Sequence, residues 1–278
     1  MVGRLAASFL VGQALRENRE RAGLSQQAAG RVIACTQTKI NYLESGRNAQ
    51  KPYEVIRLLR EYGTDERQIK RVVALARMAE RSSREARGTD AVPTWSRIFV
   101  DLERIAEEEF CYQPLVLPGQ LQTREYATAL LAGDLRVPPA QVERAVRTTM
   151  ARQRLRGEPP LRFQAVIEEQ VLDRIVGGPS VMRAQLQHLR RMMRLDTVDL
   201  RLMPPDVPVH PGLYGSFQLL TFEMASSVCY LEFLNGSSYL QDRDDVAIYH
   251  LAADRLRADA LSPAESELII SRRIAELE

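Results

Sequence analysis

Apolar and polar positions follow a helical spacing through the first third of the chain. Five runs have one apolar side each: residues 11–21, 26–31, 37–44, 52–63 and 65–87. In the third run Ile40 and Leu43 lie three positions apart, as they must to face inward together. The fifth run is amphipathic only in its first half, and its second half consists almost entirely of charged residues and residues with small side chains. The pattern predicts an all-helical domain of five helices.

Residues typical of helix ends separate these runs. Gly23 ends the first helix, and Ser25 is placed to cap the second. Thr36 stands where the third helix needs its N-cap. Pro52 takes the first position of the fourth helix and Gly63 follows its end. The boundaries of the first four helices are therefore predicted from local chemistry.

The spacing changes to the two-residue period of strands after Leu161. Four segments have strand composition: residues 161–167, 198–203, 215–222 and 228–234. Helical runs are predicted at 94–105, 123–133, 139–156 and 180–194. Ser262, Pro263 and Glu265 give a capping box at the start of a last helix. The pattern predicts an α+β domain with a small, mostly antiparallel sheet flanked by helices.

The two patterns divide the chain into a helical domain and an α+β domain. The first is expected at residues 1–88 and the second at 94–278, with a linker at about 81–93 that contains Gly88-Thr89-Asp90 as a hinge. A helix with Thr94 as its cap and Trp95 on its apolar stripe opens the second domain. Residues 222–227 form a hairpin turn between the last two strands.

Charge is distributed unevenly between these two parts. Residues 1–90 carry 17 Lys and Arg against 10 Asp and Glu, a net +7, while residues 91–278 carry 21 against 26, a net −5. A basic first third is typical of a domain that binds a polyanion. No apolar run reaches the ~18–20 residues of a membrane span, and no signal peptide is recognisable. We expect a cytoplasmic, nucleoid-associated protein.

Residues that could carry out chemistry are scattered. His188, His210 and His250 stand alone in the sequence, and Glu168-Glu169, as neighbours in a strand, would point to opposite faces. The phosphate-loop, nucleophile-elbow and zinc-protease motifs are missing. Three separated cysteines fit buried thiols better than disulfides or a metal cluster. We expect no enzyme, no metal and no cofactor.

The outward side of the third helix carries the most informative polar set. Its members are Gln37, Thr38, Lys39, Asn41 and Tyr42. Gln and Asn can pair with adenine edges, and Lys and Thr can reach guanine acceptors or phosphate. Because a recognition helix enters the major groove by its N-terminal end, these residues are predicted to read bases. The alternative is an ordinary pair of bundle helices.

Residues 25–47 resemble the Cro/repressor-like helix-turn-helix family at unbroken spacing. The matching residues are Ser25, Gln26, Gly30, Cys35, Thr36, Ile40, Asn41, Leu43 and Glu44, followed by the "ESGR" segment. The resemblance implies DNA binding, with contacts to the DNA backbone from Ser25, Gln26, Thr36, Arg47 and Lys51. It also implies that Gln26 contacts phosphate or braces Gln37. Ala29 and Ala34 depart from the family, which has leucine and the turn glycine there.

Seven further blocks, beginning with "LPGQLQTREYATALL" and ending with "RADALSPAESELI", resemble the WhiJ-type actinobacterial regulators. That resemblance covers nearly the whole chain. It implies a transcription factor, mostly a repressor of development or secondary metabolism, and a small antagonist protein of the BldB type. Gln120 replaces the first leucine of the family's P-G-L-L-Q-T loop.

Two loops of the second domain, "PGQLQT" and "HPGLYGSF", need Pro and Gly to hold one shape. They are predicted either to form a small-molecule pocket or a protein-partner face, or only to close the domain. The residues concerned are Gln120, Gln122, Tyr126, His210, Tyr214 and Tyr239. The arginines between Arg144 and Arg156 favour a solvated face, with a second nucleic-acid contact as the alternative.

Taken together, the sequence predicts a homodimeric, sequence-specific DNA-binding regulator of a near-palindromic operator, because one helix-turn-helix contacts few bases. A small partner protein or a small-molecule effector would control it through the second domain. The alternative is an antitoxin-like interaction protein that neutralises a small neighbouring protein and only autoregulates its own operon.

Overall fold

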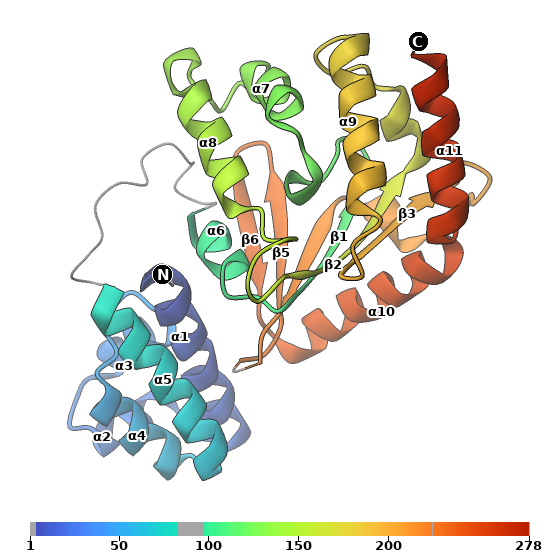
Figure 1. Cartoon of the computed structure of the whole chain (residues 1–278). Coiled ribbons are helices and arrows are strands. Elements are labelled where there is room, and N and C mark those ends of the chain that lie inside the picture. Colours follow the sequence, from blue (N-terminus) through green and yellow to red (C-terminus); the bar gives the residue numbers. More distant parts are fainter. Residues whose placement is uncertain (1–3, 83–96, 224, 278) are drawn as a thin grey trace. The chain divides into compact units, whose positions relative to one another are not determined.

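The computed structural model describes residues 4–82, 97–223 and 225–277 (Figure 1). The chain divides into two compact units. The first comprises residues 1–89, 95–105 and 221–227, and the second comprises the remainder. The predicted hinge at Gly88-Thr89-Asp90, the cap at Thr94 and the core role of Trp95 lie outside the described residues, as does the linker beyond Ser82.

The first unit contains the five predicted helices. They are α1 (Arg4–Arg21), α2 (Gln26–Val32), α3 (Gln37–Glu44), α4 (Pro52–Glu61) and α5 (Glu66–Ser82). The first unit also includes α6 (Arg97–Glu103), in which Leu102 is buried. The all-helical domain expected from the sequence is confirmed. Helices α1–α5 together are called the head below.

Capping follows the sequence prediction closely. The Ser25 hydroxyl accepts a hydrogen bond from the backbone N–H of Ala28 at 3.1 Å. Gly23 and Gly63 adopt φ of +66° and +72°, a left-handed conformation that glycine enters without steric cost. Pro52 occupies the start of α4 as predicted.

Helix α1 differs from its predicted start, whereas the predicted end of α5 lies outside the described residues. Helix α1 begins at Arg4 instead of Val11, because Ala6, Ala7 and Leu10 are buried and extend its apolar side upstream. Helix α5 is described as far as Ser82. Its inward residues are those predicted: Ile69, Val72, Val73, Leu75 and Ala76 are buried.

The second unit is built on one six-stranded mixed sheet. Its strands are β1 (Glu108–Gln113), β2 (Arg162–Glu168), β3 (Val198–Met203), β4 (Phe217–Thr221), β5 (Val228–Phe233) and β6 (Gly236–Leu240). The spatial order is β3-β2-β1-β4-β5-β6. Strands β1, β2 and β3 pair in parallel, whereas β4, β5 and β6 pair antiparallel.

The α+β class with flanking helices is confirmed, but the sheet is mixed and larger than expected. Strands β2 and β3 were predicted, but β1, "EEFCYQ", was not, because it opens with glutamates, which are uncommon in strands, and the parallel pairing of these three strands was not predicted. Strand β6 was missed because its five residues are all half-buried and give no alternation. The turn predicted at residues 222–227 does connect the antiparallel strands β4 and β5.

Helices lie on both sides of this sheet (Figure 1). They are α7 (Arg124–Ala132), α8 (Val142–Arg152), α9 (Pro179–Met192), α10 (Arg243–Asp259) and α11 (Pro263–Glu276), with short 3-10 turns η1 (Gly119–Leu121), η2 (Pro139–Gln141), η3 (Glu169–Asp173) and η4 (Pro211–Tyr214). Figure 1 shows α10 on one side and α7, α8, α9 and α11 on the other. The predicted capping box of α11 is present at Ser262 and Glu265.

A single apolar cluster fills the space between the sheet and α10. Phe110 and Tyr112 of β1 meet Phe217 of β4 there, with ring centroids 5.5 Å and 6.2 Å from the Phe217 ring. Val246 and Leu256 enter from α10. This core fixes α10 on the sheet by one face only.

Candidate nucleic-acid interface

Helix α3 packs against the core of the head with one of its sides. The Thr36 hydroxyl accepts a hydrogen bond from the backbone N–H of Lys39 at 3.3 Å, which starts α3 as predicted. Ile40 and Leu43 are each 1% exposed. The cap and the buried pair together define which side of α3 faces outward.

Four of the five residues predicted to read bases are exposed on that outward side. Gln37, Thr38 and Asn41 are exposed, and in the described part of the chain their side chains make no hydrogen bond. Tyr42 is 38% exposed beside them. Uncommitted amide and hydroxyl groups at the N-terminal half of a helix are suited to base edges in a major groove.

Lys39 does not belong to this exposed set. Its ammonium lies 2.6 Å from Oε1 of Glu54, a buried carboxylate at the start of α4. This hydrogen bond raises the pKa of Lys39. In the structure this ion pair holds α3 to α4, and the base-reading role of Lys39 stays a prediction.

The residues expected to contact the DNA backbone are mostly at the surface. Ser25, Thr36, Arg47 and Lys51 are exposed. Gly46, at φ +68°, turns the chain after α3 and places Arg47 just beyond it. Ser25 and Thr36 stand at the starts of α2 and α3, Arg47 follows the end of α3, and Lys51 precedes α4.

Gln26 is the exception, because its amide is used inside the head. Nε2 donates to Oε2 of Glu44 at 2.8 Å, so Gln26 braces Glu44 and not Gln37. The side chain is half-buried. Its function in the structure is to link the start of α2 to the end of α3.

Glu44 is the centre of a buried ionic cluster. Arg19 of α1 donates Nε to Oε1 at 2.6 Å and Nη2 to Oε2 at 3.0 Å, a bidentate pair. Its Nη1 also donates to the carbonyl of Leu24 at 2.8 Å. The hydrogen bond to Glu44 raises the pKa of Arg19. One carboxylate therefore joins α1, α2 and α3 and fixes the angle at which α3 is presented.

One feature of the sequence points to this cluster, although the cluster was not predicted. Glu44 stands four positions after Ile40, on the side of α3 that faces the core. A carboxylate on an inward side requires a buried partner, since an unpaired buried charge is costly. Its partner Arg19 lies 25 residues away in the sequence, so spacing alone did not reveal it.

The turn between α2 and α3 is tight and includes a strained position. Ala34 adopts φ +52°, the left-handed conformation for which the helix-turn-helix family uses glycine. A Cβ at Gly30 would lie 2.6 Å from the carbonyl oxygen of Cys35. Glycine at position 30 therefore permits the close approach of the turn residue Cys35 to α2.

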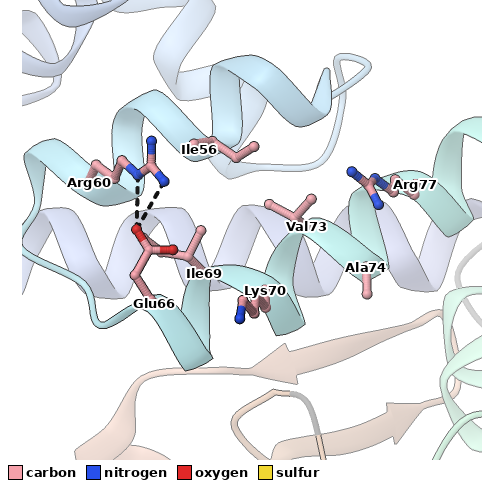
Figure 2. Close-up of a pocket in the computed structure, with 8 residues that line it drawn as sticks. All are labelled: Ile56, Arg60, Glu66, Ile69, Lys70, Val73, Ala74 and Arg77. Carbon is pink, nitrogen blue, oxygen red and sulfur yellow. Dashed lines mark hydrogen bonds and ion pairs between the residues drawn. The ribbon is translucent and has the colours of Figure 1, made fainter.

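A hollow of about 290 Å³ lies along α4 and α5 on the same unit. Its lining is formed by Ile56, Arg60, Glu66, Ile69, Lys70, Val73, Ala74 and Arg77 (Figure 2). Figure 2 shows the Arg60 guanidinium paired with the Glu66 carboxylate, 3.0 Å away. Its basic side chains, Arg60, Lys70 and Arg77, belong to α4 and α5, so the hollow is separate from the predicted base-reading side of α3.

Three residues proposed for a pocket or partner face in the second unit are turned inward. Gln120, Gln122 and Tyr126 are 2%, 6% and 0% exposed. Gln122 donates to the carbonyl of Leu117 at 2.7 Å, and Tyr126 accepts from the N–H of Leu117 at 3.3 Å. They hold the "PGQLQT" loop in shape, so a partner face at this loop would not be made of them.

His210 is also buried. The sequence suggested that it has no titratable neighbour, but the structure gives it one. Its Nε2 lies 3.5 Å from Oε1 of Glu168, which also accepts a hydrogen bond from the Tyr112 hydroxyl at 2.6 Å. Burial and this hydrogen bond raise the pKa of Tyr112. Tyr112 and Glu168 meet because β1 and β2 are parallel neighbours, and His210 joins them from the start of η4.

The remaining residues of that set are divided between surface and core. Tyr214 is 98% exposed, whereas Tyr239 packs half-buried against Tyr230 with ring centroids 5.1 Å apart. Among the arginines of the α8 region, Arg154 donates to the carbonyl of Ala106 at 3.1 Å. That arginine run is therefore partly used within the unit.

Two further expectations concern metals and thiols. Within the described ranges, His, Cys, Asp and Glu form no group of three that could hold a metal ion. Cys111 and Cys229 are buried and Cys35 is half-buried. Burial raises the pKa of Cys229 to about 12. Among the helices of the described residues, none combines the length and apolar composition that a membrane span requires.

Comparison with known proteins divides the chain in a similar way. A family model described as "Helix-turn-helix domain" matches residues 10–72. A second one, described as "Domain of unknown function (DUF5753)", matches residues 96–272, more than half of the chain. No curated protein matches, and no solved structure matches.

Proposed function

Because the chain belongs to the DUF5753 family and carries a helix-turn-helix domain at its N-terminal side, we propose that it is a sequence-specific DNA-binding transcriptional regulator. One observation carries the proposal: Gln37, Thr38 and Asn41 are exposed on α3, while Arg19 and Glu44 hold that helix from behind. A rigid helix with uncommitted polar side chains is what base reading requires.

The regulator acts as a homodimer on a near-palindromic operator. A single helix-turn-helix contacts too few bases for high specificity, and two-fold symmetry places a second copy about 10 bp away. Arg47 and Lys51, both exposed, supply contacts to the DNA backbone. The net +7 of residues 1–90 supports this, because basic charge attracts any DNA before sequence is read.

Control comes through the second unit. Its resemblance to WhiJ-type regulators supports a repressor of developmental or secondary-metabolism genes in the cytoplasm, released by a small BldB-type partner protein or by a small ligand. The chain itself works by binding, without turnover of a substrate.

The test is binding of the purified full chain to DNA from upstream of its own gene, over a salt series, with a scrambled duplex of the same length as control. Saturable binding that favours the natural duplex and weakens steeply with salt is expected. Addition of the product of a neighbouring small open reading frame identifies the type of control. Equal affinity for both duplexes at every salt concentration would contradict the proposal.

A further inference from the structure

Helix α10 has two apolar sides, although only one of them faces the sheet. The inward side carries Val246, Ala253 and Leu256, which are buried in the cluster beneath the strands. Tyr249 packs there as well, with its ring 5.0 Å from the Phe217 ring. A helix on the surface of a domain needs only this one side to be apolar.

The outward side forms a narrow seam. Its members are Asp244, Ile248, Leu251 and Arg255, spaced by four, three and four positions. At about 100° per residue they lie within about 60° of one another and face away from the buried residues. Ile248 is 63% exposed and Leu251 is 70% exposed. Two large aliphatic side chains with coiled-coil spacing are typical of a helix that packs on another helix.

The neighbouring η4 turn adds to this apolar surface. It is in contact with α10, and it exposes Leu213 by 63% and Tyr214 by 98%. Val209, just before the turn, is 74% exposed. Exposed apolar side chains gathered on adjacent elements mark an interaction surface more often than a solvated one.

From this arrangement we propose that α10 is the surface through which two copies of the chain pair, with the two α10 helices antiparallel about a two-fold axis near Tyr249. The inference deepens the proposed function and rests on it, since a palindromic operator requires two copies of the head. The occupant of the seam is therefore a second copy of this chain.

The charges on the seam favour that occupant and that orientation. In the antiparallel pair Ile248 meets the partner's Leu251, and Asp244 meets the partner's Arg255, each twice by symmetry. A parallel pair would place Asp244 against the partner's Asp244 and Arg255 against the partner's Arg255. Like charges in register are unfavourable, so the seam is complementary to itself in one direction only.

Arg255 is already engaged within its own helix, and this is compatible with the pairing. Its Nε donates to Oδ2 of Asp259 at 2.7 Å. A guanidinium has five N–H donors, so its other nitrogens can reach the partner's Asp244. The side chain is 65% exposed, which leaves it room to do so.

The expected dimer is modest in strength. Helix α10 has 17 residues and is about 25 Å long, so two such helices bury less than the ~800 Å² per partner of a typical interface. Because so small an area must offset the loss of translational and rotational freedom, a dissociation constant on the order of micromolar is expected.

The first test is sedimentation equilibrium of the full chain without DNA, up to roughly 100 µM, well above that constant. Leu251→Asp is expected to weaken the dimer by tenfold or more. Leu268→Asp on α11 is the matched control, because Leu268 is 61% exposed on another helix of the same unit. The control is expected to dimerise like the natural chain.

The second test is a charge exchange that depends on the antiparallel register. Asp244→Arg and Arg255→Asp are each expected to weaken the dimer several-fold, and the double variant is expected to restore it. Restoration excludes simple misfolding as the cause of the single effects. The melting temperature of each variant is recorded alongside, since Asp244 also lies in the first turn of α10.

The inference is overturned by a natural chain that stays monomeric, by a dimer that Leu251→Asp leaves intact, or by a double variant as weak as the single ones. These outcomes are separate from the fate of the proposed function. A chain that dimerises through α10 but binds no DNA selectively supports the inference and overturns the function. A chain that is monomeric in the absence of DNA but still selects its operator overturns the inference and leaves the sequence-specific DNA binding of the proposed function in place.

Discussion

Glu44 shows at the scale of one residue how the head holds its recognition helix. The carboxylate is 8% exposed and is held by Arg19 and Gln26, which come from two other helices. A buried ion pair contributes little compared with a well-packed apolar pair, but removal of one partner leaves an uncompensated charge. The pair therefore acts as a constraint on helix orientation.

Glu44→Ala is expected to lower the free energy of unfolding by about 3 kcal/mol, the low end for a broken buried pair, because Arg19 loses its buried partner and keeps only the half-exposed Glu20, 3.2 Å away. Urea unfolding of the full chain, followed by circular dichroism, measures the loss. Glu66→Ala is the control: its ion pair with Arg60 is exposed, with side chains 62% and 61% accessible, and is expected to cost less than about 1 kcal/mol. Equal losses for both variants would contradict a constraining role for the buried pair.

Ala34 is a position where a substitution is expected to stabilise the chain. Its φ of +52° costs an alanine roughly 1–2 kcal/mol, while glycine adds about 0.5–1 kcal/mol of unfolded-chain entropy. Ala34→Gly is therefore expected to raise the free energy of unfolding by up to about 1 kcal/mol. A shift of the urea midpoint to higher concentration is the measurement. A clear shift to lower concentration would show that the turn is not strained.

At the scale of elements, local chemistry predicted the helices far better than the strands. Ser25, Thr36 and Pro52 mark helix starts through contacts within one turn, so the sequence shows them directly. Strand β1 has no such mark, because its pairing with β2 joins Glu108 to Arg162 across the chain. The exposed seam of α10 was likewise missed, since two apolar sides blur the helical pattern.

The cap of α3 gives a prediction at this scale. Thr36→Ala is expected to cost about 1 kcal/mol of stability, since the N–H of Lys39 loses its acceptor. Thr38→Ala, on the exposed side of the same helix, is expected to leave stability unchanged within about 0.5 kcal/mol. Thermal unfolding of the two variants side by side distinguishes them. A greater loss in Thr38→Ala would place the cap elsewhere.

At the scale of the whole molecule, the chain joins a basic helical head to a mildly acidic α+β unit. The net charges of +7 and −5 were visible in the sequence, as was the α+β class. The parallel pairing of β1, β2 and β3 and the meeting of His210 with Glu168 were not visible, because both depend on contacts between distant segments. Sequence reasoning therefore predicted the helix-turn-helix region and its exposed helix side, and the second unit only in outline, while the assignment of α3 residues to base reading stays a prediction.

The charge of the head predicts a specific effect of Arg47. Arg47→Ala is expected to weaken binding to natural and scrambled duplexes alike, because a backbone contact carries no sequence information. The slope of log affinity against log salt should become shallower by about 1. Affinity measured at four salt concentrations gives that slope. A selective loss on the natural duplex would instead assign Arg47 to base reading.

The most direct measurement is the selectivity of Gln37→Ala and Asn41→Ala for the natural over the scrambled upstream duplex, by fluorescence anisotropy at fixed salt. Each variant is expected to lose about 1–3 kcal/mol on the natural duplex, roughly 5- to 150-fold in affinity, and to bind the scrambled duplex as before. If both variants kept the full selectivity of the natural chain, the exposed side of α3 would not be the surface that reads DNA.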